Sequence, residues 1–418
     1  MTSQVLATLT SPRLTFITVW CIAALGAHAA PTTDQQKLAS ANTGFAFKLL
    51  KEITKEQPAR NVFISPYSVS SVLQMVCNGA GGKTKEELQQ VLGTTGLTLP
   101  AMNQAHENLS QAIHSGSSNV VLNSANAIWH RQGIPIKPEF LACNKQFYQA
   151  QVEGLDFNDP ASVGIMNGWV NEMTRGKIPS MVAGPIPPLT CLYLANAIYF
   201  KGGWFTPFEA KDTKERVFHL RGGQQKKLPM MTRTGDFSYR RGTGYQAVRL
   251  PYKDWSMAMY VFLPDPNSSP EKLVAIMNGD NWQRITLPGF SEKKGTLVLP
   301  RFKLEYAVDL KKPLRAMGLR HAFEAADFSG ISSVPLFISE ARQKSFVEVN
   351  EEGTEAAAAT FGVTKGGIEM NPPKPFEMIV DRPFLFVIHH SADTGSSILF
   401  MGMVSDPDTS TPQLPRRP

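Results

Sequence analysis

Residues 351–360, with the sequence Glu-Glu-Gly-Thr-Glu-Ala-Ala-Ala-Ala-Thr, restrict the fold of this chain more than any other segment. Successive side chains of an extended strand point to opposite faces, so alternate residues share a face. One face would carry only small, uncharged side chains, those of Thr354, Ala356, Ala358 and Thr360. Such a face suits a strand that must enter a crowded sheet.

A short alanine-rich helix is the alternative structure for this segment, because alanine is the best helix former. The flanking residues favour the extended structure. Residues 346–350 before it are strand-like, and residues 362–375 after it are rich in glycine and proline. We therefore predict an extended segment that continues from a strand.

Length and charge exclude some classes of protein. The 418 residues allow two to three domains or one large α/β domain, and the 42% hydrophobic content is ordinary for a globular protein. The interior holds no long apolar run, so we expect no membrane-spanning helix in the mature chain. The net charge of +7 is not concentrated in one arm, which argues against a nucleic-acid partner.

Residues 1–29 have the pattern of a signal peptide. Arg13 closes a weakly basic stretch, residues 14–25 form an apolar core that is short for a membrane span, and Ala27-His28-Ala29 is a small-x-small cleavage pattern. An uncleaved N-terminal anchor is the alternative. We predict a secreted, extracellular protein whose mature chain begins at Ala30.

Cleavage would remove Cys21 and leave Cys77, Cys143 and Cys191. An odd number of cysteines allows at most one disulfide, so we predict three buried, unreactive thiols rather than a disulfide-stapled scaffold. Asn108 and Asn267 begin glycosylation sequons, whose use depends on the secretion route of the host.

The coarse pattern of apolar residues is that of an α+β protein without regular βαβ alternation. Ser65 and Pro66 have the residue types of a helix cap and a first helical position. Helices are predicted over residues 39–53, 68–77, 83–91, 102–114 and 310–317. Strands are predicted over residues 119–129, 192–200, 297–306, 384–390 and 397–404, and at several places within 217–264.

Motifs of enzymes and metal sites are missing from the sequence. It has no Gly-x-Ser-x-Gly elbow, phosphate loop, dinucleotide fingerprint or His-Glu-x-x-His helix, and its cysteine spacings do not suit zinc. His389 and His390 are adjacent in a predicted strand and point to opposite faces, so they are poorly placed to bind one ion. We predict no enzymatic activity, no metal and no cofactor.

Six or more sequence blocks, in the same order, resemble those of the serpin family, the serine protease inhibitors. The blocks are Asn61-Val62-Phe63-Ile64-Ser65-Pro66-Tyr67-Ser68, Asn167-Gly168-Trp169-Val170 with Thr174-Arg175-Gly176-Lys177-Ile178, Asn196-Ala197-Ile198-Tyr199-Phe200-Lys201-Gly202-Gly203-Trp204 with Pro207-Phe208, Leu299-Pro300-Arg301-Phe302, Asp327-Phe328-Ser329-Gly330-Ile331, Asp381-Arg382-Pro383-Phe384-Leu385-Phe386 and Phe400-Met401-Gly402. The resemblance covers roughly residues 37 to 407.

The resemblance implies a serpin fold with three β-sheets, about eight to nine helices and an exposed reactive-centre loop over about residues 351–380. It implies one domain over residues 30–406, followed by a proline-rich, disordered tail at 407–418. Serpins act as suicide substrates: a serine protease forms an acyl-enzyme with the loop, and the cleaved loop then inserts into the main sheet. A monomeric protease inhibitor is therefore expected.

The resemblance also assigns roles to individual residues. The hinge that must enter the sheet comprises Glu351, Gly353, Thr354, Glu355, Ala356, Ala357, Ala358, Ala359 and Thr360. A small, uncharged inward face favours an inhibitor over the alternative, a non-inhibitory carrier or chaperone. The polar residues beneath the opening sheet would be Ser65, Ser68, Asn196 and Gln343, the last replacing a common family histidine. Trp204 matches the tryptophan at the top of the sheet, and Glu351 would pair with Arg301.

Family spacing places the reactive bond at Gly367-Ile368, with Lys365 and Met370 as alternatives because the segment up to Pro383 is longer than usual. Gly367 suits an elastase-like or subtilisin-like protease, whereas Lys365 suits a trypsin-like protease. Residues 86–130 contain no Lys or Arg. Basic residues instead cluster within 221–241, namely Arg221, Lys226, Lys227, Arg233, Arg240 and Arg241. They form either a solvated surface or a binding site for a polyanion.

Overall fold

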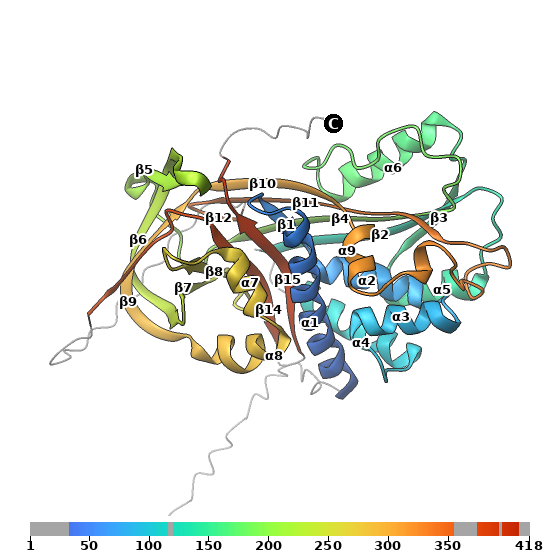
Figure 1. The fold of residues 1–418 in the computed structure, drawn as a ribbon, viewed down its shortest axis with the longest axis horizontal. Coiled ribbons are helices and arrows are strands. Elements are labelled where there is room, and N and C mark those ends of the chain that lie inside the picture. Colours follow the sequence, from blue (N-terminus) through green and yellow to red (C-terminus); the bar gives the residue numbers. More distant parts are fainter. Residues whose placement is uncertain (1–32, 116–119, 355–373, 393–394, 409–418) are drawn as a thin grey trace, which may run out of the picture.

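The computed structural model describes residues 33–115, 120–354, 374–392 and 395–408. This part of the chain has an α+β architecture in which helices dominate the first half and strands the second (Figure 1), as the sequence predicts. The helices are α1 (Thr33–Glu56), α2 (Pro66–Cys77), α3 (Gly82–Leu92), α4 (Leu99–His114), α5 (Pro138–Tyr148), α6 (Pro160–Met173), α7 (Pro270–Ile276), α8 (Gly279–Asn281) and α9 (Lys311–Ala316).

A six-stranded sheet forms one layer of the molecule. Its strands lie in the order β10 (Phe302–Asp309), β11 (Ile338–Asn350), β12 (Gly353–Thr354), β4 (Leu192–Gly203), β2 (Val120–Arg131) and β3 (Gln151–Leu155). β4 is antiparallel to β2 along almost its whole length, and it is parallel to β11 over residues 338–346 of that strand.

The other described strands form a nine-stranded hydrogen-bonded network rather than two separate sheets. β6, which is 18 residues long, pairs with β5 near its start and with β7 near its end, and this joins what the resemblance predicts as separate sheets. The remaining strands are β1 (Val62–Ile64), β5 (Lys214–His219), β6 (Gln225–Gly242), β7 (Tyr245–Pro251), β8 (Met257–Pro264), β9 (Ser291–Pro300), β13 (Phe376–Ile379), β14 (Phe384–Ala392) and β15 (Gly395–Val404).

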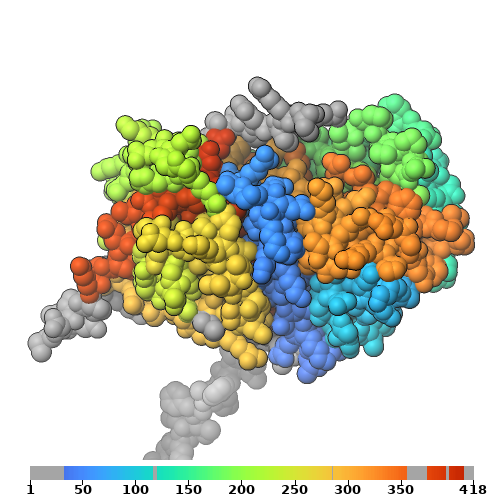
Figure 2. All heavy atoms as spheres, viewed as in Figure 1, coloured from blue at the N-terminus to red at the C-terminus, as the bar shows by residue number. Residues whose placement is uncertain are grey.

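Apolar side chains cover both faces of the six-stranded sheet. On one face β4 residues such as Ile198 and Phe200 belong to the main core, in which β4 contacts α2 and Phe200 packs against Phe400 of β15. On the other face a second cluster packs Met166 and Val170 of α6 against β4. α1 lies at the surface between α7 and the segment that carries α9 (Figure 2). None of the helices in the described ranges is long and apolar enough to cross a membrane.

Local sequence signals explain where several elements begin. Ser65 is the N-cap of α2: its hydroxyl accepts the amide hydrogen of Ser68, and Pro66 occupies the first turn. The single strand predicted over residues 297–306 is wrong. The chain breaks at Arg301, and β9 and β10 belong to different sheets. The sequence pattern did not predict helices α5 and α6.

The prediction that all three thiols are buried needs correction. Cys77 is buried, but Cys143 and Cys191 are only partly buried, and all three thiols are free. Burial raises the pKa of the Cys77 thiol to about 11. The predicted burial is wrong for Cys143 and Cys191. Just beyond residue 406, Lys226 Nζ donates to the Pro407 carbonyl, and the Lys303 N–H of β10 donates to the Asp408 carbonyl.

Candidate functional site

The candidate site is the end of the six-stranded sheet at which β4 and β11 separate, beyond the pair Tyr199 and Phe346. The two strands pair directly from Ile338 up to Phe346, which lies opposite Tyr199. Above that point β12 lies between them and is antiparallel to both. Thr354 pairs with Val349 on one side and with Gly202 on the other, so the chain that leaves β11 turns back and enters the sheet.

Gly353 occupies a position that no other residue could share. A Cβ atom there would collide with the carbonyl oxygen of Gly202 and would lie 2.6 Å from the Cα of Gly203, and its φ is +152°. The side chain of Asn350 fixes the preceding turn, because its Oδ1 accepts the amide hydrogens of Glu352 at 3.1 Å and Gly353 at 3.3 Å.

Trp204 holds the top of this turn. Its indole Nε1 donates to the Asn350 carbonyl at 3.0 Å, and its backbone N–H donates to the Glu352 carbonyl at 2.9 Å. The side chain is 1% exposed. Trp204 therefore acts both as a core residue and as a donor to the hinge, so the packing and hinge interpretations of the sequence are compatible.

Glu351 and Arg301 form the ion pair that the resemblance implies. Arg301 Nε donates to both carboxylate oxygens, at 2.8 and 2.9 Å, and the Thr213 hydroxyl donates to Oε1. The Glu351 side chain is 9% exposed and that of Arg301 is 41% exposed. Burial alone would raise the pKa of the Glu351 carboxyl, but the hydrogen bonds from Arg301 and Thr213 outweigh it and lower that pKa.

The predicted polar residues beneath the sheet form one buried network. Gln343 Oε1 accepts the Ser65 amide hydrogen at 3.0 Å, and Gln343 Nε2 donates to the Ser65 carbonyl at 3.0 Å and to Asn196 Oδ1 at 2.8 Å. Asn196 Nδ2 in turn donates to the Ser68 hydroxyl and, at 2.7 Å, to Asn126 Oδ1. The amide of Gln343 thus ties β11 to β4 and to the start of α2, with a donor and an acceptor both in use.

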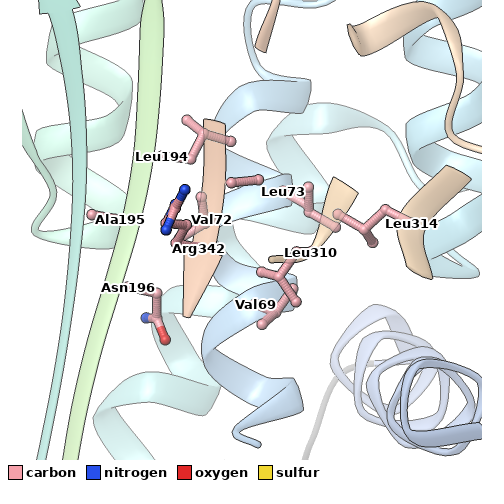
Figure 3. A pocket seen from close by; sticks show the side chains of 10 residues that line it. Val69, Val72, Leu73, Leu194, Ala195, Asn196, Leu310, Leu314 and Arg342 are labelled. Atoms are coloured by element: carbon pink, nitrogen blue, oxygen red, sulfur yellow. The ribbon is translucent and has the colours of Figure 1, made fainter. Parts of the chain in front are cut away.

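A cavity of about 10 Å³ adjoins this network, below the line where β4 meets β11. Figure 3 shows side chains of α2, α9 and β4 around it, among them Val72, Leu314 and Leu194. Its volume is close to that of one water probe, yet its lining is almost entirely apolar. The packing behind the junction of the two strands is therefore incomplete.

Tyr252, Thr213 and Asn126 complete the site but were missed in the sequence. Each one reaches the site from a strand or loop far away in the chain, and no local motif identifies it. Several predicted site residues fall outside the described part of the chain, namely Glu355, Ala356, Ala357, Ala358, Ala359, Thr360, Lys365, Gly367, Ile368 and Met370.

The basic residues of 221–241 do not form one exposed cationic face. Arg233 stacks on Phe237, with its guanidinium carbon 4.3 Å from the ring centroid, and burial lowers its pKa to about 10. Arg221 is paired with Glu271, and Arg241 with Asp265. This arrangement favours the solvated-surface interpretation over a polyanion site.

Comparisons with known proteins agree on one family. The family model described as "Serpin (serine protease inhibitor)" matches residues 40–407. The leukocyte elastase inhibitor of Bos taurus is 36% identical over 386 residues, which are 89% of this chain and 100% of that protein. Serpin B6 of Pongo abelii is 37% identical, over 88% of this chain and 99% of its own. The structure of human thyroxine-binding globulin in complex with thyroxine superposes with a TM-score of 0.80, at 26% identity, covering 90% of this chain and 99% of that one.

Proposed function

The chain belongs to the serpin family and has the serpin fold, and we propose that it is a secreted suicide-substrate inhibitor of serine proteases. The family is described as that of the serine protease inhibitors. In the proposed mechanism a protease attacks the reactive-centre loop and forms an acyl-enzyme. The cleaved loop then inserts between β4 and β11 before the acyl-enzyme hydrolyses.

The position of β12 is the observation that carries this proposal. Two hinge residues, Gly353 and Thr354, already pair with both neighbouring strands. Between them and the closed part of the sheet lie Val347 and Glu348 of β11 and the facing residues of β4. A strand that extended β12 in the same register would enter at this point.

The sequence after Thr354 suits entry in that register. Thr354 faces the main core, as do Gly202 and Val349 beside it, so Ala356, Ala358 and Thr360 would follow on the same face. None of these residues is charged, so no charge would be buried without a partner. Thr360 would come level with Asn196 and Gln343, where its hydroxyl could join the polar network once the two strands separate.

The reactive bond and the target protease extend the proposal to residues outside the described part of the chain. We place the bond at Gly367-Ile368, which suits an elastase-like or subtilisin-like protease. Lys365, for a trypsin-like protease, and Met370 remain the alternatives. The leukocyte elastase inhibitor among the relatives supports a serine protease as the target class without identifying the enzyme.

Secretion and the domain limits are part of the proposal as well. The family match begins at residue 40, so residues 1–29 precede the matched region. Their apolar core and their Ala27-His28-Ala29 pattern support a cleaved signal peptide. We assign the serpin domain to residues 30–406. Sequencing the N-terminus of the protein exported by its host would test the predicted start at Ala30.

Covalent trapping tests the proposed function directly. The mature chain is incubated with elastase, subtilisin, trypsin and chymotrypsin, and the products are separated on a denaturing gel. We expect a band at the summed mass, and the mass of the released C-terminal peptide fixes the reactive bond. The control is Ala358→Arg, which places a charge on the inward face and should be cleaved without trapping the protease.

A carrier function is the second candidate. It is supported by the likeness to human thyroxine-binding globulin, whose structure holds thyroxine. The two candidates differ in the effect of loop cleavage on heat stability. An inserting loop should raise the melting temperature sharply, whereas a loop that stays outside the sheet should leave it unchanged. Cleavage without trapping and without stabilisation would favour the carrier.

A further inference from the structure

Tyr252 lies directly behind the point where the hinge enters the sheet. The residue follows β7 and is fully buried. Its ring stacks on Trp204, with centroids 4.8 Å apart and planes at 15°, and meets the edge of Phe200 at 5.1 Å. Its hydroxyl lies 2.8 Å from the hydroxyl of Thr354, which is also fully buried.

The backbone around Tyr252 keeps this ring in place. The Tyr252 N–H donates to the Met257 carbonyl at 3.0 Å, and the Lys253 N–H donates to the Gly203 carbonyl at 2.8 Å. Gly202 leaves room for the ring, since a Cβ at that position would lie 2.8 Å from Tyr252 Cδ1. The backbone next to Tyr252 is thus hydrogen-bonded to β4, and the hydroxyl of Tyr252 faces the slot, the space between β4 and β11 in which β12 lies.

The hydrogen bond between Tyr252 and Thr354 joins two hydroxyls that are shielded from water. Both hydroxyls are buried, so each would lose this hydrogen-bonding partner if the other were removed. Burial also raises the pKa of Tyr252 far above its usual range, so its O–H stays protonated and can either donate or accept.

We propose that Tyr252 is a positioning residue that holds Thr354 inside the sheet before any protease arrives. Insertion then starts from a strand whose first two residues are already in register, rather than from a free loop. This inference rests on the proposed inhibitory function for its consequence, but the contact itself can be tested without a protease. Without the hydroxyl of Tyr252, the hinge should leave the slot more often, insertion should start later, and more acyl-enzyme should hydrolyse.

Three variants test this role. Tyr252→Phe removes one hydroxyl, Thr354→Val removes the other with little change of shape, and the double variant removes both. The matched control is Tyr306→Phe, because Tyr306 also donates a largely buried hydroxyl, but to Gln57 at 3.1 Å, which directly follows α1. Amide hydrogen exchange at residues 353–354 is measured first, in the uncleaved full-length protein.

The expected result is exchange at residues 353–354 that is about three- to tenfold faster in Tyr252→Phe, the range for one neutral hydrogen bond. Exchange at residues 353–354 should be no faster in the double variant than in the faster-exchanging single variant, because both single changes remove the same hydrogen bond. Tyr306→Phe should leave this exchange unchanged. Unchanged exchange in Tyr252→Phe, or additive effects in the double variant, would overturn the inference.

The stoichiometry of inhibition provides the second readout. For a protease that the unmodified protein traps, Tyr252→Phe should consume more inhibitor per trapped protease, while the rate of loop acylation stays the same or rises. A purely structural defect would instead lower the thermal stability without changing this ratio, and would contradict the positioning role. If the unmodified protein traps no protease, the proposed function fails, whereas the exchange experiment still decides whether Tyr252 holds the hinge.

Discussion

The pair formed by Arg301 and Glu351 predicts a measurable loss of stability when its cation is removed. The Glu351 side chain is 9% exposed in the intact pair, and in Arg301→Ala its carboxylate would keep Thr213 as a side-chain donor. A hydrogen bond to a charged group is worth about 1.5–3 kcal/mol, and the 41% exposure of Arg301 argues for the lower half of that range. We expect Arg301→Ala to lower the free energy of unfolding by about 2 kcal/mol.

The dependence on pH follows from the lowered pKa of Glu351. A carboxyl whose pKa is lower in the folded state stabilises the fold above its ordinary pKa of 4.5, and this contribution is lost as the pH falls through the folded-state pKa. The difference between Arg301→Ala and the unmodified protein should therefore be complete at pH 7. It should shrink below pH 4.5, where the carboxyl becomes protonated.

Urea unfolding of four proteins provides the assay: the unmodified chain, Arg301→Ala, Glu351→Gln and the double variant. The double variant should be more stable than the sum of the single losses predicts, because Glu351→Gln removes the unpaired buried charge that Arg301→Ala creates. Strictly additive losses, or equal effects of Arg301→Ala at pH 7 and below the folded-state pKa, would refute the reasoning.

Three further predictions concern the interior and the thiols. Gln343→Leu removes the hydrogen-bonding partner of the Ser65 N–H and of Asn196 Oδ1. It should lower the free energy of unfolding, measured in urea, by about 2–4 kcal/mol. A loss below about 1 kcal/mol would mean that water replaces the amide of Gln343. Burial lowers the pKa of His389 to about 3, with a smaller contribution from neighbouring positive charges, and it lowers the pKa of His390 to about 4 although the charge of Asp254 opposes the shift. Each histidine should therefore cost about 1.4 kcal/mol per pH unit below 6.5, and His389→Phe should flatten the dependence of the melting temperature on pH between pH 7 and 5. An unchanged slope would contradict this. The partly buried Cys191 should react with a thiol reagent in the native protein while the buried Cys77 reacts only after unfolding, as read by mass spectrometry, and equal rates would indicate local opening around α2.

The sequence predicts the fold well because its signals are local or ordered along the chain. The N-cap at Ser65 and the blocks shared with serpins need no knowledge of distant contacts. The same blocks led to the pairing of Arg301 with Glu351, which are 50 residues apart. The family order, rather than the chemistry of either residue alone, made that pair predictable.

The contacts that escaped prediction depend on side chains from elements that meet only in three dimensions. Tyr252 and Thr354 are 102 residues apart, and neither belongs to a pattern that names the other. The break at Arg301 was also missed, because apolar residues continue on both sides of it and periodicity cannot reveal that the chain changes sheets. Partial exposure of Cys191 likewise depends on how the loop before β4 packs.

Strand β6 has a consequence for how the molecule melts. It shares hydrogen bonds with β5 and β7 at its two ends and with β9 over residues 230–239. The loss of β5, β7 or β9 would therefore leave part of β6 without its backbone hydrogen bonds. Calorimetry should record a single cooperative transition for this network, with the amides of β6 among the last to exchange. A chain of this size could otherwise melt in stages, and β6 ties its strands into one cooperative unit.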